Sequence, residues 1–193
     1  MKELKQRILR DGRAIKEKNI VLVGSFLNHQ LDPQLMMHCA EEFTRLFKDQ
    51  GINKIVTNEA SGIAPAIMTG YLIDLPVVFI KKKMPNSVDE AWKSWLWSFT
   101  RSDNVAVCID RRFLAADDRI LFIDDFLADG HASGSAIHFC RQSGAQIVGM
   151  GFLVEKGFAK GGPFLRDHNI PYHALATIKR INEDNTLELE LHL

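Results

Sequence analysis

The feature that most constrains this chain is a short apolar run followed at once by two acids and a loop of small residues. Residues 120–123 (Ile-Leu-Phe-Ile) are β-branched, aromatic or aliphatic, which is typical of a strand buried on both faces. Asp124 and Asp125 follow, and after a short turn residues 132–141 predict a helix. Because a strand buried on both faces needs helices on both sides of its sheet, this stretch predicts an α/β fold with a parallel sheet.

The junction between this strand and the helix predicts an anion site. Unpaired backbone N–H groups and the positive end of the helix dipole point at the loop, outside the carboxyl end of the strand where ligands bind in open α/β sheets. When ionised, Asp124 and Asp125 only accept hydrogen bonds, so they suit vicinal hydroxyls or hydroxyls shared with Mg²⁺. Together these features indicate a ribose that carries a 5′-phosphate. The alternative is that the two aspartates merely close a strand before a turn.

The same stretch resembles a known motif. An apolar strand, two acids and a short loop that enters a helix make up the phosphoribosyl-pyrophosphate motif of the type I phosphoribosyltransferases. The resemblance implies a sugar substrate, 5-phosphoribosyl 1-pyrophosphate (PRPP), bound at the loop.

Composition bounds the class of protein. The chain has 193 residues, of which 46% are hydrophobic, enough for one domain with a sizeable core. Lys plus Arg and Asp plus Glu are 24 each, so overall charge does not favour nucleic acid or a membrane as partner. Three widely spaced cysteines, Cys39, Cys108 and Cys140, and no secretory leader predict buried thiols in a reducing cytoplasm.

The remaining pattern alternates strands and helices. Residues 2–10 predict a charged helix, and Asp32-Pro33 predicts the start of another whose apolar stripe is Leu35, Cys39, Phe43 and Phe47 and whose end is Gly51. A further short helix opens at residues 161–163. Strands are predicted at residues 20–23, 52–57, 76–80, 105–109, 146–154, 172–178 and 187–191. This order implies right-handed crossovers and a parallel sheet.

A second strand-to-helix junction carries Ser61 and Gly62. A hydroxyl and an unobstructed backbone at such a place form another candidate anion site. A Ser-Gly pair before a helix is also a common N-cap, which is the more frequent use of such a pair. Beside the first loop, the pair predicts a pyrophosphate loop.

Residues 81–101 interrupt the alternation of strands and helices. Three lysines at 81–83 precede a turn, and Trp95 and Trp97 lie in an alternating pattern that predicts a strand or hairpin arm. A long insertion beside a phosphate site predicts a mobile lid that excludes water. The alternatives are a solvated surface turn for the lysines and core or dimer-interface packing for the tryptophans.

Short segments along nearly the whole chain make the resemblance more specific. They are residues 25–33, 59–66, 98–100, 123–128 and 155–156, and among them Phe-Leu-Asn-His-Gln and Ile-Asp-Asp-Phe-Leu-Ala resemble the bacterial xanthine phosphoribosyltransferase family. The resemblance implies a purine-salvage enzyme that converts xanthine and PRPP to xanthosine 5′-monophosphate and pyrophosphate, acting as a cytoplasmic homodimer. It also implies a single domain over residues 1–193, with a parallel twisted sheet, a small hood formed by about 1–30 and 156–193, and a lid at about 81–101.

The resemblance also implies site residues by position. PRPP binding falls on Asp124, Asp125, Ala128, Asp129, Gly130, His131 and Ala132, and pyrophosphate on Ala60, Ser61 and Gly62. Purine contacts fall on Val21, Asn28, Phe126 and Lys156, and Mg²⁺ arrives with PRPP near Asp124 and Asp125. A Lys ammonium and an Asn amide suit the carbonyl acceptors of xanthine. No residue is assigned as a catalytic base, and His29 is interpreted as a packed polar residue.

The chain departs from the family at two places. The family loop typically reads Ala-Asn-Gly-Gln-Ala, whereas this chain has Ala-Asp-Gly-His-Ala at residues 128–132. We expect the carboxylate of Asp129 to repel phosphate and lower PRPP affinity, unless His131 is protonated or the Asp129 side chain turns outwards as a helix N-cap. The lid is acidic and Trp-rich at residues 89–97.

These departures keep two alternatives open. One is guanine or hypoxanthine as the base, which differ from xanthine at C2. The other is a non-catalytic regulatory module that binds nucleotide or PRPP.

Overall fold

The computed structural model describes residues 1–83, 90–98 and 103–190. The helices are α1 (Lys2–Asp11), α2 (Pro33–Phe47), α3 (Ile63–Ile73), α4 (His131–Ser143) and α5 (Gly161–Asp167), with short helical turns η1 (Lys16–Lys18), η2 (Gly24–Asn28) and η3 (Arg111–Phe113). The strands are β1 (Arg13–Ile15), β2 (Ile20–Leu22), β3 (Lys54–Asn58), β4 (Val77–Ile80), β5 (Ala91–Ser98), β6 (Asp103–Asp110), β7 (Arg119–Leu127), β8 (Gln146–Lys156), β9 (Tyr172–Ile181) and β10 (Leu187–Leu189).

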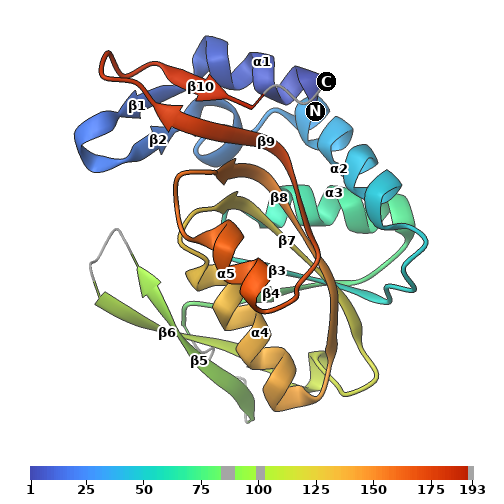
Figure 1. Ribbon diagram of the computed structural model, residues 1–193. Coiled ribbons are helices and arrows are strands. Elements are labelled where there is room, and N and C mark those ends of the chain that lie inside the picture. Colours follow the sequence, from blue (N-terminus) through green and yellow to red (C-terminus); the bar gives the residue numbers. More distant parts are fainter. Residues whose placement is uncertain (84–89, 99–102, 191–193) are drawn as a thin grey trace.

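A six-stranded sheet with the order β10-β9-β8-β7-β3-β4 forms the centre of the protein (Figure 1). Five strands run parallel to one another, namely β9, β8, β7, β3 and β4. The edge strand β10 is antiparallel to β9. The predicted α/β class is therefore confirmed. The antiparallel edge lies at the C-terminal end of the described chain.

Side chains of β7 alternate between two cores. Leu121 and Ile123 belong to a core that includes residues of α1, α2 and α3. Ile120 and Phe122 belong to a second core that includes residues of α4 and α5. Because successive side chains of a strand point to opposite faces, the sheet is covered by helices on both sides, as Figure 1 shows. This is why residues 120–123 are apolar throughout.

Helix α2 begins as its sequence predicts. Asp32 is its N-cap and accepts a hydrogen bond from the backbone N–H of Leu35 at 3.2 Å, with Pro33 at the first helical position. The stripe of Leu35, Cys39, Phe43 and Phe47 is buried. The helix ends at Phe47, four residues before the expected Gly51. All three cysteines of the chain are buried and free.

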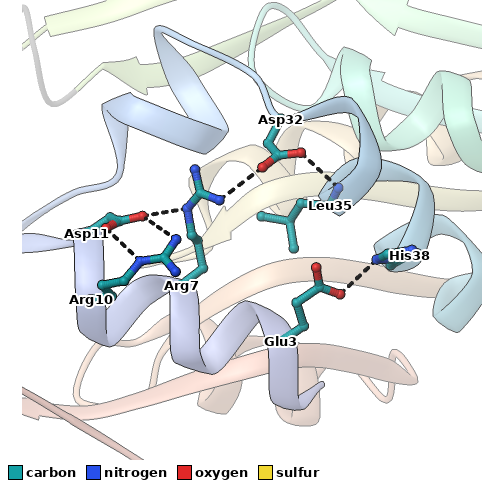
Figure 2. A network of polar contacts seen from close by, with 7 residues as sticks. All are labelled: Glu3, Arg7, Arg10, Asp11, Asp32, Leu35 and His38. Atoms are coloured by element: carbon teal, nitrogen blue, oxygen red, sulfur yellow. Dashed lines mark hydrogen bonds and ion pairs between the residues drawn. The ribbon is translucent and has the colours of Figure 1, made fainter.

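Charged side chains fix α1 against the start of α2 (Figure 2). The guanidinium of Arg7 lies 2.5 Å from Asp11 Oδ2 and 3.0 Å from Asp32 Oδ2. Glu3 lies 2.7 Å from Nδ1 of His38. Asp32 therefore serves both as the cap of one helix and as the ion-pair partner of the other.

The two ends of the chain pack against each other. The amino group of Met1 donates to the carbonyl of Leu175, and Lys5 Nζ donates to the carbonyl of Glu190 at 2.8 Å. Strands β1 and β2 form an antiparallel hairpin, of which the sequence pattern predicted only the second strand. Segments far apart in the sequence thus come together beside α1 (Figure 1).

The segment that interrupts the alternation of strands and helices forms a two-stranded antiparallel sheet, β5 with β6. Trp95 is 70% exposed on this hairpin, while Trp92 donates from Nε1 to the carbonyl of Leu114 at 3.2 Å. The predicted strand around Trp95 is confirmed. Residues 84–89 and 99–102 of the expected lid lie outside the described residues. Within the described ranges, no helix has the length and apolar character needed to cross a membrane.

Candidate active site

The carboxyl ends of β3 and β7 meet at the two acids. In the parallel register Thr57 lies beside Ile123, which places Asn58 next to Asp124. Asn58 Nδ2 donates to Asp124 Oδ2 at 3.1 Å, and the backbone N–H of Asp125 donates to Asp124 Oδ1 at 3.0 Å. Asp124 is buried, at 6% exposed, whereas Asp125 is half-buried. The two carboxyl groups therefore line one edge of the sheet at different depths.

Both acids are held in surroundings that disfavour their charge. Burial, followed by the charge of Asp125, raises the pKa of Asp124 well above its ordinary value of 3.8. Burial also raises the pKa of Asp125, although hydrogen bonds from neighbouring groups, Ser61 among them, lower it in part. A pair of this kind gains from any ligand that brings hydroxyl donors or positive charge.

Ser61 connects the predicted subsites. Its Oγ accepts a hydrogen bond from Asn28 Nδ2 at 2.8 Å, and Ser61 lies near enough to Asp125 to lower the pKa of that acid. A residue from the predicted purine set therefore contacts one from the predicted pyrophosphate loop, beside the two acids. Ala60 is exposed beside them, so its backbone is open to a ligand.

Gly62 is packed directly against the acids. A Cβ atom at this position would lie 2.2 Å from Thr57 Oγ1 and 2.6 Å from Asp124 Oδ1. Real Cβ atoms do not approach so closely, and therefore no side chain fits here without moving the loop or the acid. The predicted pyrophosphate loop and the ribose acids are brought together by this contact.

The loop after β7 surrounds a cavity of about 200 Å³. Its lining is residues 124–133, which includes Ala128, Asp129, Gly130, His131 and Ala132. Gly130, with φ +85°, is the N-cap of α4, and the helix starts one residue before the predicted Ala132. Ser133 also lines this cavity, and its Oγ is buried with no hydrogen-bond partner among the described residues. The backbone N–H groups at the start of α4 and this hydroxyl are the kind of donors that the predicted anion site requires.

Asp129 does not cap α4, so the N-cap interpretation of its side chain is wrong. Its Oδ1 accepts a long hydrogen bond, 3.4 Å, from the backbone N–H of Lys160 in the next strand-to-helix connection. Gly130 takes the cap position because a positive φ is required there, and a Cβ would lie 2.9 Å from Phe164.

Lys156 lies over the ring of Phe126, with Nζ 5.9 Å from the ring centroid. Its Nζ donates to the carbonyl of Asn19 at 3.0 Å, and burial lowers its pKa. Val21 is buried in the core against which Phe126 packs. Of the residues predicted to hold the purine, Lys156 and Phe126 are thus in direct contact, whereas Asn28 contacts Ser61.

Two residues at the end of β3 were missed as site residues. Asn58 holds Asp124, and Glu59 Oε1 accepts from the backbone N–H of Lys82 at 2.5 Å, which fixes the start of the expected lid. The available signal was a pair of polar residues directly after a predicted strand. The packed interpretation of His29 is wrong, because this residue is exposed.

Known structures share this fold. Adenine phosphoribosyltransferases from Thermoanaerobacter pseudethanolicus and Trypanosoma brucei superimpose with TM-scores of 0.73 and 0.76, at 17% and 18% identity. The alignments cover 91% and 98% of this chain, and 98% and 85% of theirs. The chain therefore has the type I phosphoribosyltransferase fold.

Sequence relatives specify the family. Proteins named xanthine phosphoribosyltransferase from Lactobacillus delbrueckii subsp. bulgaricus and Ligilactobacillus salivarius are each 44% identical to this chain, and one from Leuconostoc mesenteroides is 43% identical. The alignments cover 97%, 98% and 98% of this chain, and 99%, 98% and 100% of the relatives. No protein-family model matches the chain. At this identity and coverage, the chain belongs to the xanthine phosphoribosyltransferase family.

Proposed function

We propose that this protein transfers the 5-phosphoribosyl group of PRPP to xanthine, giving xanthosine 5′-monophosphate and pyrophosphate. The observation that carries the proposal is that Gly62 packs against Asp124 while the adjacent Ser61 accepts a hydrogen bond from Asn28, so that residues of the three predicted subsites lie at one sheet edge. In this reading the loop 128–132 binds the 5′-phosphate, with Ser133 as an added donor, and Asp124 and Asp125 bind the ribose hydroxyls. Residues 60–62 bind pyrophosphate.

The purine lies between Phe126, Lys156 and Asn28, with Val21 behind it. A half-buried ammonium suits a base that carries carbonyl oxygens and loses a proton easily, because both the carbonyl oxygens and the deprotonated base are stabilised by a positive charge nearby. As pyrophosphate leaves, the anomeric carbon becomes cation-like, so these residues act by positioning and by charge stabilisation. No residue is proposed as a general base.

Mg²⁺ is the proposed cofactor, and it enters bound to PRPP. Asp124 and Asp125 fit it, because carboxylate oxygens are preferred Mg²⁺ ligands and both acids have pKa values raised by burial. When bound, the ion neutralises the charge of the leaving pyrophosphate.

Turnover with four bases tests the function. Xanthine, guanine, hypoxanthine and adenine are each supplied with PRPP and Mg²⁺, and pyrophosphate release is followed. We expect xanthine to give the highest kcat/KM. If guanine or hypoxanthine were turned over faster, that base would be the substrate instead of xanthine. If the protein bound nucleotide but released no pyrophosphate with any base, the non-catalytic regulatory module would be the better description.

Two peripheral regions complete the proposal. The packed chain ends, about residues 1–30 and 156–193, form a hood over the purine, since Asn19 and Lys156 both come from it. A lid that excludes water is proposed to begin at Lys82, whose backbone N–H is held by Glu59. The enzyme works in cytoplasmic purine salvage.

A homodimer is proposed through the face that joins α3 and β4. Ile67, Tyr71, Phe79 and Phe113 are 50%, 78%, 37% and 51% exposed there. Two hollows of about 530 and 500 Å³ on this face share Pro76 and Val77. Strand β4 is also an edge of the sheet, and an exposed apolar surface beside a free edge is typical of an interface.

Tyr71→Glu is expected to convert the dimer to a monomer, because it places a charge in the centre of this apolar face. Sedimentation velocity measures the change. Leu9→Glu, on α1 at a site 57% exposed, is the control and should leave the dimer intact. A Tyr71→Glu protein that sediments like the native dimer would remove this face from the proposal.

Asp129→Asn is expected to strengthen PRPP binding several-fold, and more at pH 8 than at pH 6. The reason is that a carboxylate near the 5′-phosphate repels it, and the phosphate gains its second negative charge near pH 6. Titration calorimetry with PRPP and Mg²⁺ at both pH values measures the effect. Equal affinities of the native and variant proteins across this range would show that Asp129 does not weaken binding.

A further inference from the structure

The loop at residues 24–32, which carries Asn28, is held on both sides of that residue by one side chain of α1. Arg7 Nη1 lies 3.0 Å from Asp32 Oδ2, and the guanidinium lies over the ring of Phe26, 5.3 Å from its centroid. Figure 2 shows Arg7 reaching from α1 to Asp32 at the start of α2. Because Phe26 precedes Asn28 and Asp32 follows it, Arg7 contacts the chain on either side of a residue proposed to bind the purine.

The part of this loop that leads to Asn28 is a single helical turn of an uncommon kind. Residues 24–28 form a π-helical turn, and the carbonyl of Gly24 accepts hydrogen bonds from the backbone N–H groups of His29 at 3.0 Å and Gln30 at 2.7 Å. Single π-turns are rare and are frequent at functional sites. A helical segment this short is not stable by itself, so its position depends on contacts with the rest of the protein.

The contacts of Arg7 are more shielded from water than Asn28 itself. Phe26 is fully buried, and the side chains of Arg7 and Asp32 are only 27% and 30% exposed, so this ion pair is less screened than one on the open surface. Asn28 is exposed, and its Nδ2 donates to Ser61 Oγ at 2.8 Å. The direction of the Asn28 amide therefore depends on where the loop is held.

We propose that Arg7 is a positioning residue that holds the loop 24–32 so that the Asn28 amide faces the purine site. The inference rests on the proposed function, which takes Asn28 as a purine contact. A guanidinium suits this task because it can pair with a carboxylate and lie on an aromatic ring at once. Asp11 Oδ2, 2.5 Å from Arg7 Nε, orients the guanidinium from within α1. Arg7 itself touches no substrate and acts through the loop.

Four substitutions test this role by steady-state kinetics. Arg7→Ala removes both contacts, whereas Asp32→Ser removes the ion pair and leaves a side-chain oxygen that can cap α2. We expect both to raise KM for xanthine several-fold with little change in kcat, as the loss of a binding contact does. Arg7→Lys keeps the charge and should recover part of the loss. Arg10→Ala is the control, because Arg10 pairs with Asp11 from an exposed position on the same helix, and it should match the native protein.

A double substitution separates positioning from a general weakening of the fold. If Arg7 acts through Asn28, then Arg7→Ala should raise KM for xanthine no further in a protein that already carries Asn28→Ala. An increase by the same factor in both backgrounds would overturn the proposal, because the two residues would then act independently.

Hydrogen exchange in the free protein gives a result that does not depend on turnover. In Arg7→Ala, backbone amides of residues 24–32 should exchange faster than in the native protein, those of α4 should be unchanged, and Arg10→Ala should match the native pattern. Unchanged exchange of the loop in Arg7→Ala would overturn the proposal. Faster exchange of the loop in a protein whose native form turns over no base would support the anchoring by Arg7 and overturn only the proposed reaction.

Discussion

Gly62→Ala is expected to reduce kcat/KM for PRPP by on the order of 100-fold, the loss that a displacement of about 1 Å in a reacting group can cause. The added Cβ would lie 2.2 Å from Thr57 Oγ1 and 2.6 Å from Asp124 Oδ1. Asp124 is held by Asn58 and by its own backbone neighbour, so the loop must move instead. Displacement of this loop would also disturb the hydrogen bond from Asn28 to Ser61. Steady-state kinetics of pyrophosphate release measure the loss.

Gly134→Ala is the matched control for this substitution. Gly134 lies within α4, and a Cβ there would meet only Phe164 Cζ, at an ordinary 3.6 Å. This variant should keep native kinetics and gain roughly 0.5–1 kcal/mol of stability, because alanine favours a helix over glycine. Near-native activity in Gly62→Ala would mean that the loop tolerates displacement and that its contact with Asp124 is not part of the site.

The central sheet and its covering helices could be predicted because the sequence patterns that indicate them are local. The apolar run at residues 120–123 and the capped stripe of α2 each depend on one element and its burial. Of the β1–β2 hairpin only β2 was predicted, because β1 is three residues long and its pattern is too short to show a period. Helix α2 ends at Phe47 rather than at Gly51, because residues 48–50 form a turn in which the backbone N–H of Gln50 donates to the carbonyl of Phe47.

The two strand-to-helix junctions lie where the sequence predicted them, but the side-chain partners of their residues were not predictable. The bond from Asn58 to Asp124 joins residues 66 positions apart, and that from Lys160 to Asp129 joins residues 31 apart. Such contacts depend on strand register and on the packing of glycines such as Gly62 and Gly161. A sequence pattern shows that Asp129 follows a strand, but not towards which neighbouring loop its carboxylate turns.

Asp124→Asn is expected to make the protein more stable at pH 8 while reducing kcat/KM for PRPP by on the order of 100-fold. The activity falls because hydrogen bonds to a charged group contribute about 1.5–3 kcal/mol each, and the ribose hydroxyls would lose such an acceptor. Stability rises by roughly 1–3 kcal/mol because a buried carboxylate without a cation partner is removed. The amide also offers a donor to Asn58 Oδ1, which has no partner among the described residues.

The sign of the pH dependence follows from the raised pKa of Asp124. A carboxyl group that binds its proton more tightly in the folded chain destabilises that chain as pH rises from the unfolded value, 3.8, through the folded one. The stability gain of Asp124→Asn should thus be full at pH 8 and shrink towards pH 4, as urea unfolding at several pH values would measure. Asp118→Asn is the opposite case, because Asp118 lies 2.5 Å from Lys54 Nζ, and its loss should destabilise the protein. No gain at pH 8 in Asp124→Asn would show that the fold itself, rather than the substrate, accounts for this buried acid.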